Sequence, residues 1–180
     1  MTALTRNPSN LSLLQSTKFR LVFDRLPAVT YFCQSANLPG VSLTEVPRYT
    51  PFVELYHPGE KLMYDTFNVT FLVDEDLRSW REIHDWMRGI TFPTNFDEYK
   101  NLSKRFPGST LPTFSKNIPA YSDAYMTIFS NQNNAQFRVK LIDMFPVNLG
   151  SILFNSTDSA ENTIVSDATF RFSYYDIELI

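Results

Sequence analysis

The sequence predicts a mainly β protein, a two-sheet β-sandwich or barrel with one flanking α-helix. Several short segments alternate apolar and polar residues with period two, turn residues separate these segments, and a single segment has helical spacing. Hydrophobic residues make up 43% of the 180 residues, which suffices for one buried core. We expect one domain over residues 19–180, preceded by an N-terminal arm over residues 1–18.

The first two expected strands lie directly after the arm. Residues 19–23 alternate with phenylalanine and leucine on one side, as in a half-buried strand. A turn at Leu26-Pro27 leads into residues 30–36, and the sequence Asn-Leu-Pro-Gly at 37–40 ends that run. We expect these two strands to pair as a hairpin.

A second, longer hairpin is expected next. Residues 41–55 are rich in Thr, Val and Tyr, and Pro47 and Pro51 predict a bent or edge strand because proline removes a backbone donor. The turn sequence His-Pro-Gly at 57–59 should reverse the chain into residues 62–73, where the alternation returns.

One amphipathic helix is expected over residues 74–87. Asp74 can cap its N-terminus, and Gly89 suits a left-handed stop at its C-terminus. Apolar side chains at helical spacing should pack on a sheet, and they are Leu77, Trp80, Ile83 and Met87.

The remaining chain predicts a loop followed by more strands. Residues 91–120 contain four prolines and show no clear periodicity, which indicates a long Pro-rich loop. Strands resume at 124–129 and 137–141, joined as a hairpin by the Asn-rich turn at 131–134. A last strand carries three aromatic residues on one side, Phe170, Phe172 and Tyr174.

Charge and composition argue against several classes of protein. The net charge of −3 and the pI near 5.4 disfavour a protein that grips nucleic acid through clustered Lys and Arg. Cys33 is the single cysteine, so we expect a reducing compartment and a small buried side chain. The N-terminus lacks a signal-peptide core and no segment is apolar enough to span a bilayer, so we expect a soluble protein made in the cytoplasm.

No catalytic constellation is visible in the sequence. His57 and His84 lie on different expected elements, and neither has a nucleophile motif beside it. The sequence has no glycine-rich phosphate loop and no pair of histidines spaced for zinc, and the acidic run at 74–76 is interpreted as the helix cap. We therefore expect no enzyme activity, no cofactor and no metal.

Several motifs carry a resemblance to a known family. Residues 32–40, FCQSANLPG, follow the form F-x-C-x-x-A-x-x-L-P with a one-residue slip, and residues 67–75 form a strand that ends in acidic residues. More specific are the turn FPVNLG at 145–150 and the ending FSYYD at 172–176. In order and kind these segments resemble the tail tube proteins of contractile phage tails, which are related in fold to the tube subunits of type VI secretion.

The resemblance covers residues 19–90 and 122–177 and implies a structural subunit of a tail tube. Six copies would form a ring, and stacked rings would make the channel for genome ejection, through which DNA passes without specific binding. The implied partners are further copies of the chain and the sheath, baseplate and tail-terminator proteins, in the tail of the virion. We expect the two N-terminal hairpins to line the channel.

Two segments lie outside the resemblance, the arm at 1–18 and the Pro-rich loop at 91–120. Because their composition cannot support a core of its own, we expect them to contact neighbouring subunits. The expected anchors are apolar and aromatic side chains, Leu11, Leu13, Leu14, Phe92, Phe96, Tyr99, Phe106 and Phe114.

Two other functions stay open from the sequence. A baseplate tube initiator or a tail terminator of the same fold would assemble as a single ring, and the length of the chain favours it slightly. A small-ligand-binding or hydrolytic β-barrel would need one large pocket with converging polar groups.

Overall fold

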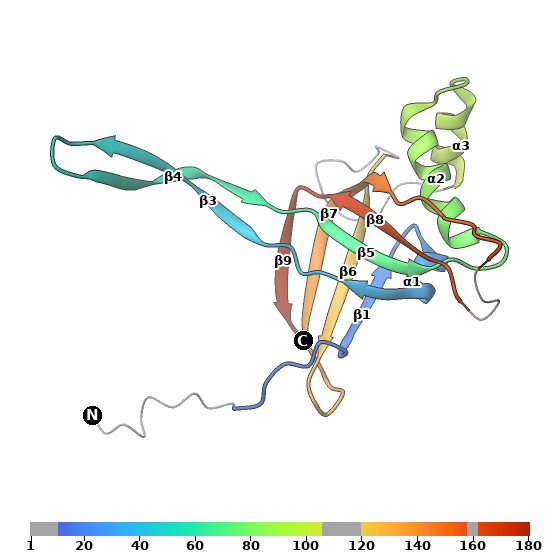
Figure 1. Cartoon of the computed structure of the whole chain (residues 1–180), viewed down its shortest axis with the longest axis horizontal. Helices are drawn as coiled ribbons and strands as arrows, with labels where there is room; N and C mark the ends of the chain where they lie inside the picture. Colours follow the sequence, from blue (N-terminus) through green and yellow to red (C-terminus); the bar gives the residue numbers. More distant parts are fainter. Residues whose placement is uncertain (1–10, 106–119, 158–161) are drawn as a thin grey trace.

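The computed structural model describes residues 11–105, 120–157 and 162–180. Strands dominate these residues, and the mainly β prediction is confirmed (Figure 1). In chain order the elements are β1 (Phe19–Phe23), α1 (Pro27–Phe32), β2 (Cys33–Ala36), β3 (Val41–Tyr49), β4 (Glu54–Tyr64), β5 (Phe67–Leu72), α2 (Arg78–Thr91), α3 (Asp97–Arg105), β6 (Ser122–Phe129), β7 (Ala135–Leu149), β8 (Val165–Arg171) and β9 (Tyr174–Leu179).

Seven of the strands form one antiparallel sheet that folds over itself into two packed layers. Sheet A contains β1, β6, the first part of β7 and β9, and sheet B contains the last part of β7 with β8, β5 and β2. The 15-residue strand β7 passes from one layer to the other. Its partner changes from β9 to β8 around Asp143, whose φ of 55° marks the bend.

The core lies between the two layers. Phe67 and Phe170 of sheet B are fully buried, and Phe23 of sheet A packs on Phe170 with 5.4 Å between ring centroids. Ile83 and Trp86 of α2 are also buried against this cluster. Helix α2 therefore flanks the layers, as the sequence predicts.

The predicted pairing of the first two strands is wrong. Residues 27–32 form helix α1, and β1 pairs with β6, where Phe19 lies opposite Ile128. Pro27 explains the start of the helix, because its fixed φ and missing N–H suit the first helical turn. The Thr30 hydroxyl then accepts a hydrogen bond of 3.0 Å from the Phe23 backbone N–H, which closes the turn.

The second predicted hairpin exists, but its tip is elsewhere. β3 pairs with β4, and the chain reverses between Tyr49 and Glu54 instead of at 57–59. Gly59 lies within β4, where a Cβ would sit 2.5 Å from the Thr44 carbonyl oxygen, so the glycine serves a close approach of two strands. β5 belongs to sheet B, between β2 and β8.

The helical region differs from its prediction at both ends. Helix α2 begins at Arg78, and Asp74 lies before it as a cap, accepting hydrogen bonds of 2.8 and 2.7 Å from the Ser79 backbone N–H and hydroxyl. Although burial alone would raise it, these hydrogen bonds hold the pKa of Asp74 below its ordinary value. Gly89 lies inside the helix, where an added Cβ would sit 3.0 Å from Leu102 of α3.

The predicted loop at 91–120 contains a helix, α3, which packs on α2. The single-helix prediction is therefore incomplete, since α1 and α3 are also present. The hairpin of β6 and β7 is confirmed. The predicted last strand is divided into β8 and β9, so Phe170 is buried while Tyr174 is exposed at the start of β9.

Candidate assembly surfaces

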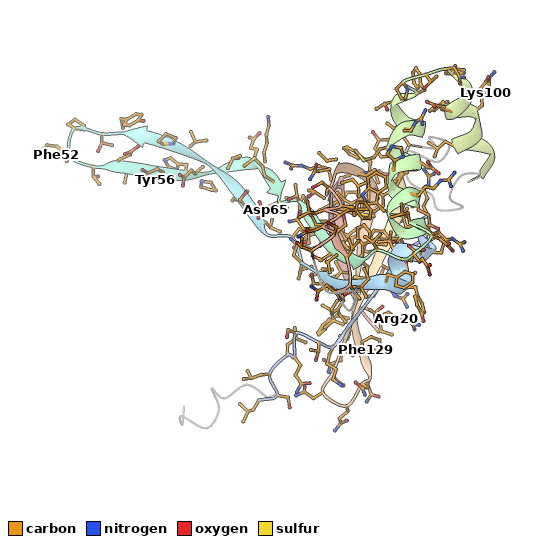
Figure 2. All side chains as sticks on the ribbon, turned by 45° about the vertical axis from the view of Figure 1, so that its right-hand side comes forward. Arg20, Phe52, Tyr56, Asp65, Lys100 and Phe129 are labelled. Carbon is orange, nitrogen blue, oxygen red and sulfur yellow. The ribbon has the colours of Figure 1, made fainter. Side chains whose placement is uncertain are left out.

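A hairpin arm projects from the body of the molecule. β3 and β4, of 9 and 11 residues, pair with each other alone in the part of the chain that the structure describes. Figures 1 and 2 show the arm extending away from the sheets, with side chains on both of its faces. Its exposed large apolar residues are Val41, Leu43, Val46, Tyr49, Phe52, Val53, Leu55, Tyr56, Leu62 and Met63.

The exposure of this arm points to a partner. Phe52, at the tip, is 98% exposed, and Tyr49 beside it is 77% exposed. An isolated two-stranded hairpin is marginally stable in water, and a contiguous apolar surface of this kind marks a site of association. The base of the arm is anchored, because the Tyr64 ring lies 5.2 Å from Tyr175 and 5.6 Å from Phe172.

Sheet A has two free edges. Among the described strands, β1 pairs only with β6, and β9 pairs only with β7. The face of sheet A that points away from the core is charged, and Arg20, Arg138 and Glu178 lie on one row across it. Unpaired strand edges bind further strands, so both edges are candidate contacts with other chains.

An ion pair between a buried carboxylate and a half-buried lysine lies near one end of this charged face. The Asp123 carboxylate accepts a 3.2 Å hydrogen bond from the Asp143 backbone N–H, and its second oxygen lies 3.8 Å from the Lys140 amine. Partial burial raises the pKa of Asp24, and the Asp123 charge raises it further. Burial, together with the charge of Asp24, also raises the pKa of Tyr125. Electrostatic coupling is thus concentrated where β1, β6 and β7 meet.

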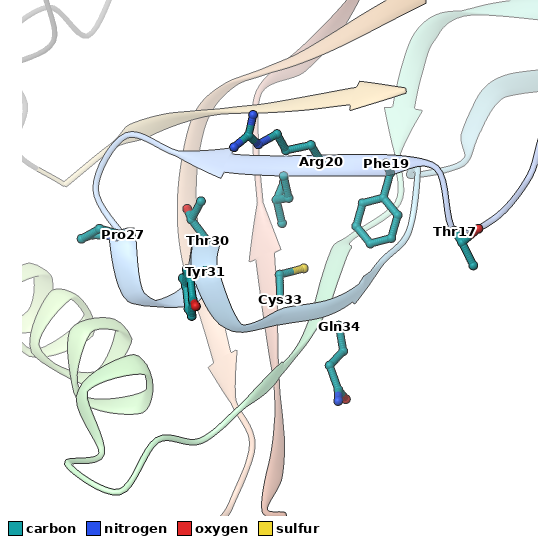
Figure 3. Close-up of a pocket in the computed structure, with 9 residues that line it drawn as sticks. Thr17, Phe19, Arg20, Pro27, Thr30, Tyr31, Cys33 and Gln34 are labelled. Carbon is teal, nitrogen blue, oxygen red and sulfur yellow. The ribbon is translucent and has the colours of Figure 1, made fainter. Parts of the chain in front are cut away.

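A groove of about 570 Å³ separates the facing edges of β1 and β2 (Figure 3). Phe19 and Cys33 point into it, and Tyr31 lies at its border. Cys33, the first residue of β2, is half-buried and packs against the core, so the predicted small buried side chain is buried only in part. Burial raises the pKa of its thiol to about 11, which keeps the thiol protonated and unreactive at neutral pH.

Three of the predicted interface residues come together in the structure. The rings of Phe92, Phe96 and Tyr99 form one cluster at the junction of α2 and α3, with centroid distances of 5.6 to 6.2 Å. Phe92 and Phe96 are exposed. Contact between this cluster and another chain stays a prediction.

The leucines of the N-terminal arm lie far from that cluster in the chain. Leu11, Leu13 and Leu14 are all exposed, and the last two border a groove of about 250 Å³ with Ile128 and Phe137. Their role in assembly is also a prediction. The remaining two predicted anchors, Phe106 and Phe114, lie outside the described residues.

The structure places the two histidines apart. His57 is exposed on β4, and His84 of α2 stacks on Trp80 with 5.1 Å between ring centroids. Within the described ranges, no three His, Cys, Asp or Glu side chains are grouped as metal ligands. The helices that the structure describes are too short or too polar to cross a bilayer.

Sequence reasoning missed the association surface of the projecting arm. The Thr, Val and Tyr content of residues 41–55 predicted β3, and Pro47 and Pro51 indicated an edge, but the turn predicted at 57–59 lies inside β4. The signal that could have found the surface is the number of large apolar residues among 49–56, where Tyr49, Phe52, Val53, Leu55 and Tyr56 stand beside only two polar residues, Thr50 and Glu54. In a strand pair with one solvated face, every second residue would be polar.

Comparison with known proteins identifies the family. A model of the phage tail tube protein family matches residues 12–178. The tail tube terminator protein of Enterobacteria phage T4 is 25% identical over 154 residues, which cover 84% of this chain and 79% of that protein. Two similar solved structures come from contractile injection systems, and at their low identities they support the fold alone.

The first is the tube-terminating cap of the anti-feeding prophage, with a TM-score of 0.56 and 12% identity over 100% of both chains. The second is the sheath/tube terminator of the PVC extracellular contractile injection system, with a TM-score of 0.55 and 12% identity over 92% of this chain and 96% of that one. Because the family model matches residues 12–178, the chain belongs to the phage tail tube protein family.

Proposed function

We propose that this chain forms a hexameric ring that ends a phage tail tube. The observation that carries the proposal is the similarity to the terminator protein of phage T4, which covers 84% of this chain and 79% of that protein. The free edges of sheet A support a ring, because they supply two complementary contacts on one molecule. The proposed role is structural, without catalysis, cofactor or metal.

The geometry of sheet A suits closure by rotation. Its strands alternate in direction from β1 through β6 and β7 to β9, so the two edge strands run in opposite directions. A rotated copy therefore places its β1 antiparallel to β9, and six copies leave no exposed edge. Such a contact joins two different surfaces and closes as a ring.

The projecting arm lies on the correct side for this contact. Its base touches β9 through Tyr64 and Tyr175, and it extends away from β1, α1 and β2 (Figure 1). In a ring the arm would reach past the edge of its own body toward the next copy. That position would cover the exposed apolar residues of the arm, which the chain alone leaves in water.

The second candidate is the main tube subunit, with rings stacked into a channel for genome ejection. The family description favours it, since the matching model is that of the tail tube protein. In either role we propose the tail of the virion as the location, with sheath and baseplate proteins as neighbours. DNA would pass through the ring without specific binding.

Native mass spectrometry and negative-stain microscopy of the purified full-length chain test these assignments. Single six-membered rings are expected for the terminator. Stacked tubes would favour the main tube subunit instead. A monomer over a range of micromolar to hundred-micromolar concentrations would contradict both.

A further inference from the structure

We infer that the charges of sheet A select one register for the contact between copies, with Arg20 of β1 opposite Asp176 of β9 in the neighbouring copy. In the same register Lys18 lies opposite Glu178. This inference rests on the proposed ring. The partner is a second copy of this chain, because the charges along the edge of β9 complement those along the edge of β1.

The side-chain alternation limits the registers that are possible. On β1, Phe19, Leu21 and Phe23 face the core, and on β9 the core side is that of Tyr175 and Ile177. A shift by one residue would turn the core side of one strand toward the lumen, so only shifts by two residues remain.

The core side of β9 also needs a partner. Ile177 is 57% exposed, although its row across sheet A is buried at Val139, Met126 and Leu21, and Leu179, in the next apolar row, is 80% exposed. A neighbouring β1 placed beside β9 sets Phe19 against Ile177, so the apolar rows continue between copies. One contact between copies would therefore cover the exposed apolar side chains of β9 and pair its charged side chains.

Three registers satisfy the alternation and bring the strands together over most of their length. With Arg20 opposite Asp176, Lys18 meets Glu178 and Val22 meets Tyr174, so two opposite-charge pairs form. Opposite charges directly across a strand pair are stabilising.

The other two registers are poorer. A shift that sets Arg20 opposite Ile180 places Asp24 opposite Asp176, and like charges at this position are destabilising. The intermediate register, shifted by two residues in the same direction, sets Arg20 opposite Glu178 and Val22 opposite Asp176, which leaves one ion pair.

Barrel closure excludes the register with Arg20 opposite Glu178 for a second reason. Within one copy, the residues opposite each other across sheet A run from Arg20 through Thr127 and Arg138 to Glu178. If Glu178 faced the next Arg20, the row would close on itself without an offset. A closed barrel requires tilted strands and a staggered register, which a shift of two residues per copy supplies.

Three of the four side chains that would form these pairs are available, whereas the Lys18 amine donates a hydrogen bond to the Asn133 side-chain oxygen of its own copy, which it would exchange for Glu178. Arg20 is exposed, and it forms no ion pair with any residue that the structure describes. The same holds for Asp176 and Glu178 over the described ranges. Lys140, which lies opposite Asp176 on β7, directs its amine toward Asp123 at 3.8 Å, so Asp176 keeps its outer side open.

Disulfide trapping tests the register directly. In a Cys33→Ala background, Val22→Cys with Tyr174→Cys should give a covalent ladder of up to six chains on a non-reducing gel. The matched pair Asp24→Cys with Tyr174→Cys reports the register that sets Arg20 opposite Glu178, and it should stay mostly monomeric. A ladder from the second pair without one from the first would overturn the inference.

Charge exchange supplies the second test. Arg20→Glu should raise the protein concentration needed for half-assembly at least about tenfold, because it places like charges across the contact. Combining it with Asp176→Arg should restore assembly, and Arg81→Glu on α2 serves as the control for net charge. Unchanged assembly of Arg20→Glu, or no recovery in the double variant, would overturn the register alone. A wild-type chain that forms no ring would instead overturn the proposed function.

Discussion

The guanidinium carbon of Arg25 lies 5.0 Å from the centroid of the Trp86 ring, and both side chains are buried. Burial lowers the pKa of Arg25 to about 10, yet the group stays charged at neutral pH and faces an aromatic surface that attracts a cation. The Trp86 indole also donates a 3.0 Å hydrogen bond to the Ala120 carbonyl and lies 6.3 Å from the Phe170 ring. Trp86 therefore joins α2 to sheet B and to the segments that follow β1 and precede β6.

Replacing this side chain should be among the most destabilising single changes. Trp86→Ala removes a fully buried indole together with its contacts to Arg25 and Phe170, and we expect a loss of about 3–5 kcal/mol in the free energy of unfolding. Urea denaturation followed by circular dichroism measures it. Phe52→Ala at the exposed tip is the matched control, with an expected change below about 0.5 kcal/mol. Similar losses in both variants would contradict the assignment of the core.

Ile83→Asp should abolish folding. Ile83 has no exposed surface, and an unpaired carboxylate at this position costs several kcal/mol, which is comparable to the whole stability of a domain. The variant is expected in the insoluble fraction, or unfolded by circular dichroism. Arg81→Asp, on the exposed side of the same helix, should fold and controls for the added charge. Recovery of soluble, assembled Ile83→Asp protein would refute the packing of α2.

The thiol of Cys33 should react slowly in the folded protein. Burial raises its pKa to about 11, whereas an unfolded thiol titrates near 8.5, so at pH 8 the folded protein holds roughly a hundredfold less thiolate. Alkylation by iodoacetamide should therefore be slow at pH 8, rise toward pH 11, and be fast in urea. Because the folded state holds the thiol proton more tightly than the unfolded state, Cys33 contributes to the free energy of unfolding. This contribution is complete below pH 8.5 and is lost as the pH rises from about 8.5 to 11. Equal rates in buffer and urea would contradict this environment.

The tip of the arm should matter for assembly and not for the stability of one copy. Phe52→Ser replaces a side chain that is 98% exposed, so the monomer should keep its free energy of unfolding within about 0.5 kcal/mol. The fraction of protein in rings, measured by sedimentation velocity, should fall. The same substitution at buried Phe67 should unfold the protein, which shows that the method resolves the two effects. Normal ring formation by Phe52→Ser would remove the tip from the interface.

The sequence predicts the strands better than their partners. Alternation located β1, and turn residues located the β6–β7 hairpin, because both signals are local. The partner of β1 is β6, about a hundred residues away, and a period-two pattern says which face is buried but not which strand lies beside it. Helix α1 was missed because residues 27–32 are rich in strand-forming Val, Thr, Tyr and Phe, so packing on the body overrides local propensity.

The association surfaces were predictable in part. Aromatic residues in a polar segment pointed to Phe92, Phe96 and Tyr99, and the structure groups their rings in one cluster. The projecting arm was harder, because a strand pattern does not reveal whether its apolar face is covered within the same chain. Gly89 shows the same limit, since a glycine near a helix end fits both a left-handed stop and a close contact with Leu102.

The last prediction concerns the N-terminal arm. Leu11, Leu13 and Leu14 are exposed, and Leu13 and Leu14 lie at the border of a shallow groove with Ile128 and Phe137 instead of being buried in the body. Because these leucines contribute little to the core of one copy, deletion of residues 2–16 should leave the circular dichroism spectrum and thermal midpoint close to those of the full chain.

Assembly of the truncated protein should nevertheless weaken. Apolar side chains that stay exposed in one copy gain most of their burial from a neighbour, and such residues carry much of the energy of an interface. The deletion ends before Lys18, whose carbonyl accepts a hydrogen bond from the Phe129 N–H, so β1 keeps its pairing. Sedimentation velocity at matched concentrations compares the two proteins, and a triple Leu11→Ser, Leu13→Ser, Leu14→Ser variant separates the leucines from chain length. Rings that form equally well without residues 2–16 would show that this segment takes no part in assembly.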